Sequence, residues 1–123
     1  GDCMPIFTAD ENAKILTIAQ IELACAVDNV EAIASVAGID ALLIGPADLS
    51  NSLGVPGDLN HPRMDEAIAK VAAAAQKHGK IFGLHAGDPL TRKWMESGLT
   101  LRMSLTDMTM LQKSMEVITK LRD

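Results

Sequence analysis

The sequence predicts an α/β fold built from four strand–helix units whose strands run parallel. Four short apolar segments, several of them rich in the β-branched residues of buried strands, occur along the 123 residues. A segment with apolar residues at helical spacing follows each of them, and Gly, Pro, Asn and Asp mark the boundaries. We therefore expect one domain over residues 1–123, with parallel strands joined by right-handed crossover helices.

The first unit is predicted as a strand over residues 14–22 followed by a helix. Lys14 to Glu22 is almost continuously apolar, as in a parallel strand that is buried on both faces. Asp28 can cap a helix in which apolar residues recur at helical spacing: Val30, Ile33, Ala34 and Ala37. Gly38 stands where a helix C-cap is usual, so we expect the helix to end there.

The second unit begins with a strand over residues 41–44, which is wholly apolar. We expect residues 45–50 to turn sharply out of this strand into a long loop that contains Gly54, Pro56 and Gly57. Pro62 suits the first position of a helix that ends near His78 and Gly79. The apolar stripe of this helix consists of Met64, Ile68, Val71 and Ala75.

The third and fourth units follow the same order. Residues 81–84 form the third strand, and Asp88 as N-cap with Pro89 in the first turn starts a helix that ends near Gly98. Residues 99–105 carry a weaker strand signal because Arg102 interrupts them. Thr106 or Asp107 can cap a final helix with the apolar residues Leu111, Met115, Ile118 and Leu121. We expect Trp94 and the Met residues of this region to fill the core or a subunit contact.

Composition and charge exclude several classes of function. Lys and Arg number 11 against 16 Asp and Glu, and no basic run is interleaved with aromatic residues, so nucleic acid is not an expected partner. The apolar stretches are shorter than the roughly 20 residues of a membrane span. Cys3 and Cys25 form no CxxC pair, and we expect Cys25 to be a small buried side chain. A reducing, cytoplasmic location is expected.

Two carboxylates follow successive strands of the predicted sheet. Alternation places Gln20 and Glu22 on one face, with Glu22 at the carboxyl end of its strand, where the active sites of parallel α/β folds lie. Asp48 follows the next strand, so the two acids can converge on a hard cation such as Mg²⁺ or Mn²⁺. On spacing alone a plainer interpretation stays open, in which Asp48 caps a turn and Glu22 is solvated.

The turn between Gly45 and Asp48 adds a second feature at this edge. Leaving the strand through Gly45, Pro46 and Ala47, it can direct successive backbone N–H groups at an anion. A small carboxylate would fit there. Four such units form either a small open sheet or half of an eight-stranded barrel, and length alone does not choose between them.

Specific motifs run through nearly the whole chain. They are Gln20-Ile21-Glu22, the segment from Gly38 to Ser50 that contains Gly45-Pro46-Ala47-Asp48, Leu53-Gly54, Pro56-Gly57, Gly79-Lys80, Gly83, Gly98 and Asp107. In these motifs the sequence resembles the HpcH/HpaI family of class II pyruvate aldolases, in the order of the family's second half. The resemblance implies the C-terminal half of a TIM (β/α)8 barrel.

The resemblance also implies a reaction and a set of residues. The family consists of metal-dependent carbon–carbon lyases, which release pyruvate or add it to an aldehyde. The metal polarises the carbonyl of the 2-oxo acid. By resemblance, Glu22 and Asp48 bind Mg²⁺ or another divalent cation such as Mn²⁺. Gln20 contacts the pyruvate, and the backbone at Ala47 and Asp48, positioned by Gly45 and Pro46, holds its carboxylate.

The histidines depart from the family pattern. The family's general-base His and transition-state Arg belong to the first half of the barrel and have no counterpart here. His61 and His78 stand at the two ends of one helix, which is a common structural position. His85 ends the third strand at a position that is usually apolar in the family. It can face the aldehyde, or it can pack and form a hydrogen bond beside Asp88.

Two other functions remain as alternatives. One is a non-catalytic half-barrel that binds or assembles while keeping the metal and oxo-acid pocket. The other is an acyl-CoA lyase like the citrate-lyase β barrels, for which we would expect a basic CoA-binding patch that the sequence does not show. Four strands leave two sheet edges, so we expect a homo-oligomer or pairing with an N-terminal half-barrel.

Overall fold

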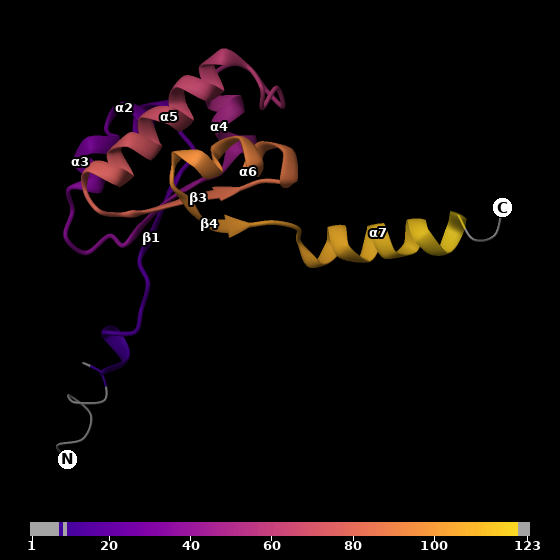
Figure 1. The fold of residues 1–123 in the computed structure, drawn as a ribbon, viewed down its shortest axis with the longest axis horizontal. Helices are drawn as coiled ribbons and strands as arrows, with labels where there is room; N and C mark the ends of the chain where they lie inside the picture. The colour runs from indigo at the N-terminus through magenta and orange to yellow at the C-terminus, as the bar shows by residue number, and fades with distance from the viewer. Residues whose placement is uncertain (1–7, 9, 121–123) are drawn as a thin grey trace.

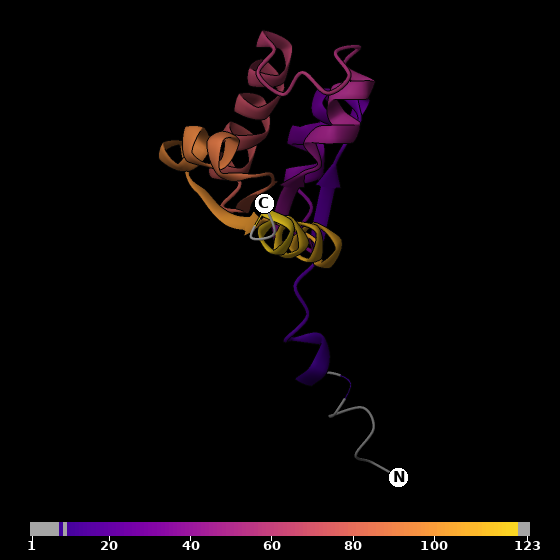
Figure 2. The same cartoon turned by 90° about the vertical axis from the view of Figure 1, so that its right-hand side faces the viewer.

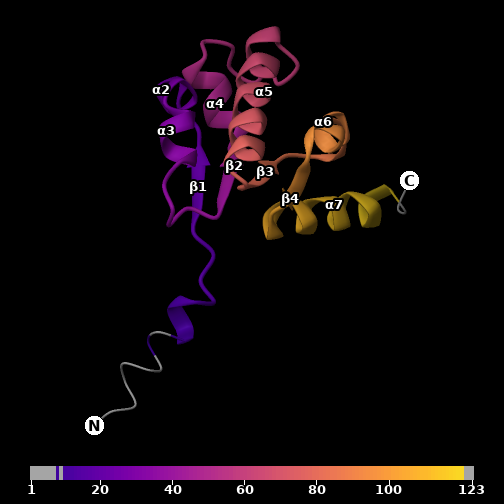
Figure 3. The same ribbon diagram turned by 60° about the vertical axis from the view of Figure 1, so that its left-hand side comes forward.

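The computed structural model describes residue 8 and residues 10–120 as a parallel sheet with helices (Figure 1). The four strands are β1 (Ile18–Ile21), β2 (Ala41–Ile44), β3 (Ile81–His85) and β4 (Leu99–Met103), and they lie side by side in chain order. Figure 3 shows this order across the sheet. All three pairings are parallel, which confirms the predicted α/β class.

The register of the sheet brings the carboxyl ends of the strands to one edge. Ile21 pairs with Ile44, and Ile44 pairs with Leu84, while a register irregularity between Phe82 and Gly83 precedes the pairing of His85 with Met103. Because the strands are parallel and in register, the segments that leave their carboxyl ends must begin close together.

Helix α5 (Pro62–Lys77) covers the middle of the sheet and follows the predicted bounds. His61 is its N-cap, and the ring Nδ1 accepts a hydrogen bond from the backbone N–H of Arg63 at 3.1 Å. The predicted stripe of Met64, Ile68, Val71 and Ala75 is buried, so that prediction is confirmed. These side chains form one core with the strand residues on the helix-covered face of the sheet, among them Ile21, Leu42, Ile44, Phe82 and Leu84.

Two short helices follow the first strand: the second lies within the predicted helix and confirms it over a shorter range, whereas the first, which ends at the predicted cap Asp28, was not predicted. They are α2 (Ala24–Asp28) and α3 (Val30–Ala34), with Asn29 between them. The Asn29 side chain donates to the carbonyl of Cys25 at 2.8 Å, a local bond that competes with continuous helix. Ser35, instead of Gly38, is the C-cap. Cys25 is exposed, contrary to expectation, and Cys3 lies outside the described residues.

Residues 46–52, expected as turn and loop, form the helix α4 (Pro46–Ser52). Pro46 occupies the first helical position, where its missing N–H costs nothing and its fixed φ favours the helix. Leu49 is buried in the core. The buried Ser50 hydroxyl donates to the carbonyl of Ala47 at 2.7 Å and accepts from the N–H of Gly57 at 3.0 Å, which fixes the following loop to α4.

The first strand is shorter than predicted and is not buried on both faces. It covers residues 18–21 instead of 14–22, and the preceding Ile15 and Leu16 are 62% and 49% exposed. Among the described residues, β1 is an edge strand that pairs with β2 alone, and its first residue with a sheet partner is Ile18. The Thr17 carbonyl still accepts a hydrogen bond from the N–H of Ala41 in β2 at 3.2 Å, but no strand of the described chain pairs with residues 14–16.

Helix α6 (Asp88–Trp94) continues into the 3-10 turn η1 (Met95–Ser97) and ends at Gly98, whose φ of 83° suits glycine. The N-cap is Gly87, one residue before the predicted Asp88. Trp94 is buried, as expected for a core residue. β4 ends at residue 103 instead of 105.

Helix α7 (Asp107–Lys120) begins at Asp107, one of the two residues predicted at its start. Leu121, which was predicted as an apolar residue of this helix, lies outside the described chain. It extends away from the sheet, and Figure 2 views it almost end-on. Its apolar side chains Met108, Met110, Leu111, Met115, Val117 and Ile118 are all exposed. The Met residues among them therefore do not fill the core of the described chain, and the other expectation, a subunit contact, stays a prediction. No helix of the described residues is long and apolar enough to cross a membrane.

Candidate active site

A cleft of about 480 Å³ lies at the carboxyl ends of the strands. It brings together every residue that the sequence proposed for the site: Gln20, Glu22, Gly45, Pro46, Ala47, Asp48 and His85. These residues come from β1, from the β2–α4 connection and from β3. Their convergence follows from the parallel register, because each of these strands ends at the same edge.

Glu22 is the first residue after β1 and is half-buried. The side-chain amide of Gln20 donates a hydrogen bond to Oε1 of Glu22. The two side chains stand two residues apart, so strand alternation directs both to the cleft face of the sheet. This contact leaves Oε2 of the carboxylate as the oxygen that the Gln20 amide does not bond.

Gly45 lines the cleft and lies directly against the side chain of Glu22. Its N–H donates to the carbonyl of Ile21 at 3.3 Å, which extends the β1–β2 pairing by one residue. A Cβ atom at this position would lie 2.5 Å from Oε1 and 2.8 Å from Cγ of Glu22. The Glu22 side chain thus occupies the space that a side chain at position 45 would fill; we call this space the Gly45 cradle.

Asp48 lies in the first turn of α4 and lines the cleft as an exposed residue, beside the exposed Ala47. The N–H of Leu49 takes the carbonyl of Gly45 at 3.0 Å as its helical acceptor. The N–H groups of Ala47 and Asp48 precede it and so have no acceptor within the helix. Backbone donors and a carboxylate thus share one wall of the cleft.

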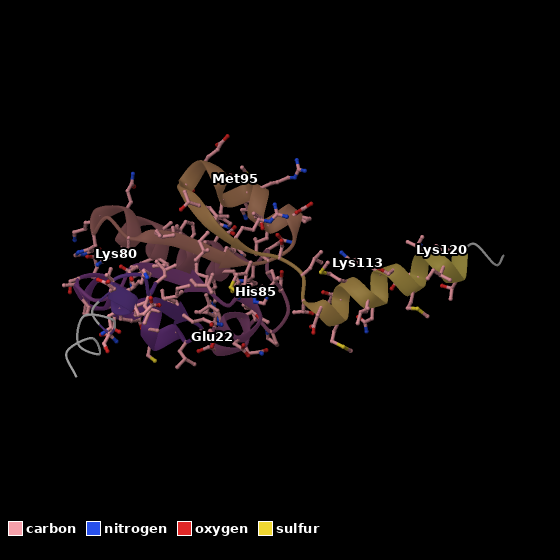
Figure 4. All side chains as sticks on the ribbon, turned by 90° about the horizontal axis from the view of Figure 1, so that it is seen from below. Glu22, Lys80, His85, Met95, Lys113 and Lys120 are labelled. Atoms are coloured by element: carbon pink, nitrogen blue, oxygen red, sulfur yellow. The ribbon has the colours of Figure 1, made fainter. Side chains whose placement is uncertain are left out.

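His85 ends β3 and is half-buried. Figure 4 shows it near Glu22, whereas Lys80, just before β3, lies at the other end of the sheet. The alternative of a hydrogen bond beside Asp88 is not what the structure has, because Asp88 pairs with Arg102. Within the described chain, no hydrogen bond is formed by the His85 ring.

The other two histidines have structural partners away from the cleft. His61 caps α5 through its Nδ1. Nε2 of His78, at the other end of α5, lies 2.9 Å from Oε2 of Glu31. Neither residue lines the cleft, in agreement with the structural position that the sequence suggested for them.

Six cleft residues were not predicted. They are Leu59 from the loop before α5, Ala86 and Gly87 after β3, and Leu105, Thr106 and Thr109 from the β4–α7 corner. The Thr106 N–H donates to Oγ1 of Thr109 at 2.7 Å, and the Thr109 N–H donates to Oγ1 of Thr106 at 3.2 Å. This reciprocal capping pattern was visible in the sequence as a helix start, but nothing there tied it to the cleft.

The residues present fit a hard divalent cation that keeps several water ligands. No group of three or more His, Cys, Asp and Glu side chains in the described part of the chain could enclose a metal ion. Mg²⁺ needs only one or two protein carboxylates and completes its shell with water and substrate oxygens. Glu22 and Asp48 on one cleft supply that number, and the Gly45 cradle leaves space for the first of them.

A parallel sheet with helices packed on one face and a cleft at its carboxyl edge matches one half of a (β/α)8 barrel. The sequence agrees: the chain belongs to the HpcH/HpaI aldolase/citrate lyase family, whose model matches residues 5–102. A 5-keto-4-deoxy-D-glucarate aldolase of Klebsiella pneumoniae is 41% identical over 98 residues. That match covers 79% of this chain and 38% of the relative, so the chain spans well under half of the relative's length.

Solved structures confirm the half-barrel and exclude the small open sheet. An HpcH/HpaI aldolase from Desulfitobacterium hafniense superimposes with a TM-score of 0.84 at 33% identity, over 96% of this chain and 46% of that one. An HpcH/HpaI aldolase/citrate lyase family protein from Burkholderia cenocepacia gives 0.79 at 38% identity, over 90% and 44%. The four units thus correspond to about half of each of these chains.

Proposed function

We propose that this chain supplies the metal- and substrate-binding half of a carbon–carbon lyase, a class II aldolase that acts on a 2-oxo acid. One observation carries the proposal: Gln20, Glu22, Asp48 and His85 leave three different strand ends and line a single cleft. Family membership gives the reaction class, and the cleft gives the residues.

In this proposal Glu22 and Asp48 are the protein ligands of Mg²⁺ or Mn²⁺. When bound, the cation supplies Lewis-acid polarisation of a carbonyl oxygen. Glu22 offers the oxygen that Gln20 does not bond, and Asp48 reaches in from the first turn of α4. Two carboxylates on one cleft leave the remaining octahedral positions for water and for the oxygens of the 2-oxo acid.

Gln20, His85 and the backbone at Ala47 and Asp48 orient the substrate. The free N–H groups of Ala47 and Asp48 donate to the substrate carboxylate, and Pro46 fixes the direction in which the backbone leaves β2. Gln20 has a second amide hydrogen for the substrate. His85 faces the aldehyde portion. The name of the Klebsiella relative supports a keto-deoxy sugar acid as the 2-oxo acid.

We further propose that a first half-barrel, in the same chain or in a partner, completes the site. The family's base and its Arg belong to that half by resemblance. The described chain has two sheet edges, β1 and β4, and matches less than half of the aldolase structures reported above. Alone, it should bind the cation and the oxo acid but cleave poorly.

Calorimetric titration of the metal-free chain with Mn²⁺ or Mg²⁺, with pyruvate or oxalate present, tests this proposal. We expect the parent to bind and Glu22→Ala and Asp48→Ala to lose binding. Glu116→Ala on α7 removes the same charge away from the cleft and should bind like the parent. A parent that does not bind, or acid variants that bind unchanged, would refute the assignment of these two ligands.

A retro-aldol assay on the chain joined to a family N-terminal half separates the enzyme from the non-catalytic module. Pyruvate release that requires Glu22 and Asp48 supports the lyase. Metal and oxalate binding without any cleavage in the completed barrel would instead support the module.

A further inference from the structure

Gly45 is a glycine whose backbone conformation does not require one. Its φ of −97° and ψ of 91° are extended values that any residue adopts. Its surroundings are different, because a Cβ there would lie 2.5, 2.8 and 3.1 Å from Oε1, Cγ and Cδ of Glu22. Carbon atoms in ordinary contact are about 3.5–4.0 Å apart. Space, and not backbone freedom, therefore explains the glycine.

Glu22 is held from a second direction by Gln20. The Gln20 amide donates to the same oxygen, Oε1, that lies nearest to the Gly45 cradle. One oxygen of the carboxylate is thus fixed by a hydrogen bond and by van der Waals contact. The orientation of the other oxygen follows from it, since the carboxylate is planar.

We propose that Gly45 is a positioning residue, which sets where the Glu22 carboxylate lies in the cleft by having no side chain. Its consequence for a bound cation rests on the function proposed above, but the positioning itself does not.

The conflict created by a side chain at position 45 should fall on Glu22 and not on the fold. Gly45 is buried, and its N–H and carbonyl are bonded to Ile21 and Leu49. The Glu22 carboxylate is the end of a flexible, half-buried side chain. Gly45→Ala should therefore rotate Glu22 away, which breaks its hydrogen bond with Gln20 and leaves the sheet intact.

The first test uses NMR of the metal-free chain and reads the side-chain amide signals of Gln20. We expect Gly45→Ala to move these signals toward their positions in Glu22→Ala. Gly87→Ala is the matched control, because Gly87 lines the same cleft with nothing within 4 Å of a Cβ. If Gly45→Ala leaves the Gln20 signals where the parent has them, the proposal is wrong.

A double variant covers the case in which Gly45→Ala does not fold. If Glu22 is the group in conflict, Gly45→Ala/Glu22→Ala should fold where Gly45→Ala does not. Failure of both variants would place the conflict elsewhere and overturn the proposal.

The second test measures Mn²⁺ affinity. We expect Gly45→Ala to lose about tenfold or more, because changing the residues that orient a metal ligand typically weakens a metal site 10–100-fold. Gly87→Ala should bind Mn²⁺ like the parent. If the parent binds no Mn²⁺ while the Gln20 signals respond as expected, the proposed ligand role fails and the positioning stands. If the parent binds and Gly45→Ala binds equally well, the positioning has no consequence for the cation and the inference fails.

Discussion

Lys77 and Glu31 form an ion pair, with 2.9 Å between Nζ and Oε2, that joins the last turn of α5 to α3. The ring of His78 reaches the same carboxylate oxygen. The hydrogen bond from Lys77, followed by that from His78, holds the pKa of Glu31 below its ordinary value of 4.5. The pair is exposed, and its measurable effect is on the pH dependence of stability.

Glu31→Gln should flatten the acid side of the stability profile. A carboxyl group with a lowered folded-state pKa stabilises the fold above its ordinary pKa, and this contribution is lost as the pH falls through the lowered value. The free energies of unfolding of parent and variant, measured in urea from neutral to acid pH, should therefore converge as the pH falls. Glu66→Gln, on α5, is the matched control, because it removes the same charge from an exposed residue that forms no ion pair in the described chain. Parallel profiles for parent and Glu31→Gln would contradict the prediction.

Leu105 should tolerate glycine better than alanine. Its φ of 67° lies in the left-handed region, which costs a non-glycine residue roughly 1–2 kcal/mol. Its side chain is half exposed, so little packing is lost on truncation. Leu105→Gly should thus be more stable than Leu105→Ala by about 1 kcal/mol in urea unfolding, the reverse of the usual order in regular structure. The usual order at this site would show that the corner is not left-handed.

Ile68→Ala should be costly, while Met115→Ala should not. Ile68 is fully buried in the core under α5, and such truncations cost about 2–5 kcal/mol. Met115 on α7 is 58% exposed, so its truncation should stay within about 0.5 kcal/mol. Urea midpoints of both variants check this. A large cost for Met115→Ala would mean that the apolar face of α7 is buried against another molecule in solution.

Ser50→Ala should loosen the loop that brings Leu59 to the cleft. The buried hydroxyl accepts from the Gly57 N–H, and its removal leaves that donor without its protein partner, at a cost of about 1 kcal/mol. Amide exchange at Gly57 should accelerate. Ser35→Ala removes an exposed hydroxyl bonded to Ala32 and should have little effect. Unchanged exchange at Gly57 would show that the loop is held by other contacts.

The sequence predicted α5 and the convergence of the site because both depend on local signals. Pro62 and the buried stripe that includes Ile68 define a helix without reference to the rest of the fold. Glu22, Asp48 and His85 follow predicted strands, and parallel pairing alone brings strand ends to one edge.

The sequence could not predict features decided by distant neighbours. Residues 14–16 belong to a segment with the composition of a strand, but whether they pair depends on a strand that the described chain does not place beside them. Leu59 and Thr109 line the cleft from a loop and a helix that are remote from the ends of β1 and β2 in sequence. For α4, the signals were present, but Gly45 and Pro46 also suit a turn, and only the burial of Leu49 distinguishes the two.

The strand order has a consequence for how this chain acquires its structure. Ile18 pairs with Ala41, and Ala41 pairs with Ile81, so each of these strands pairs with a strand that is next to it in chain order. No pairing among the described strands requires a later segment to insert between two earlier ones. During synthesis each unit can dock on the one before it as soon as it emerges, with loop closures no longer than a single strand–helix–strand segment.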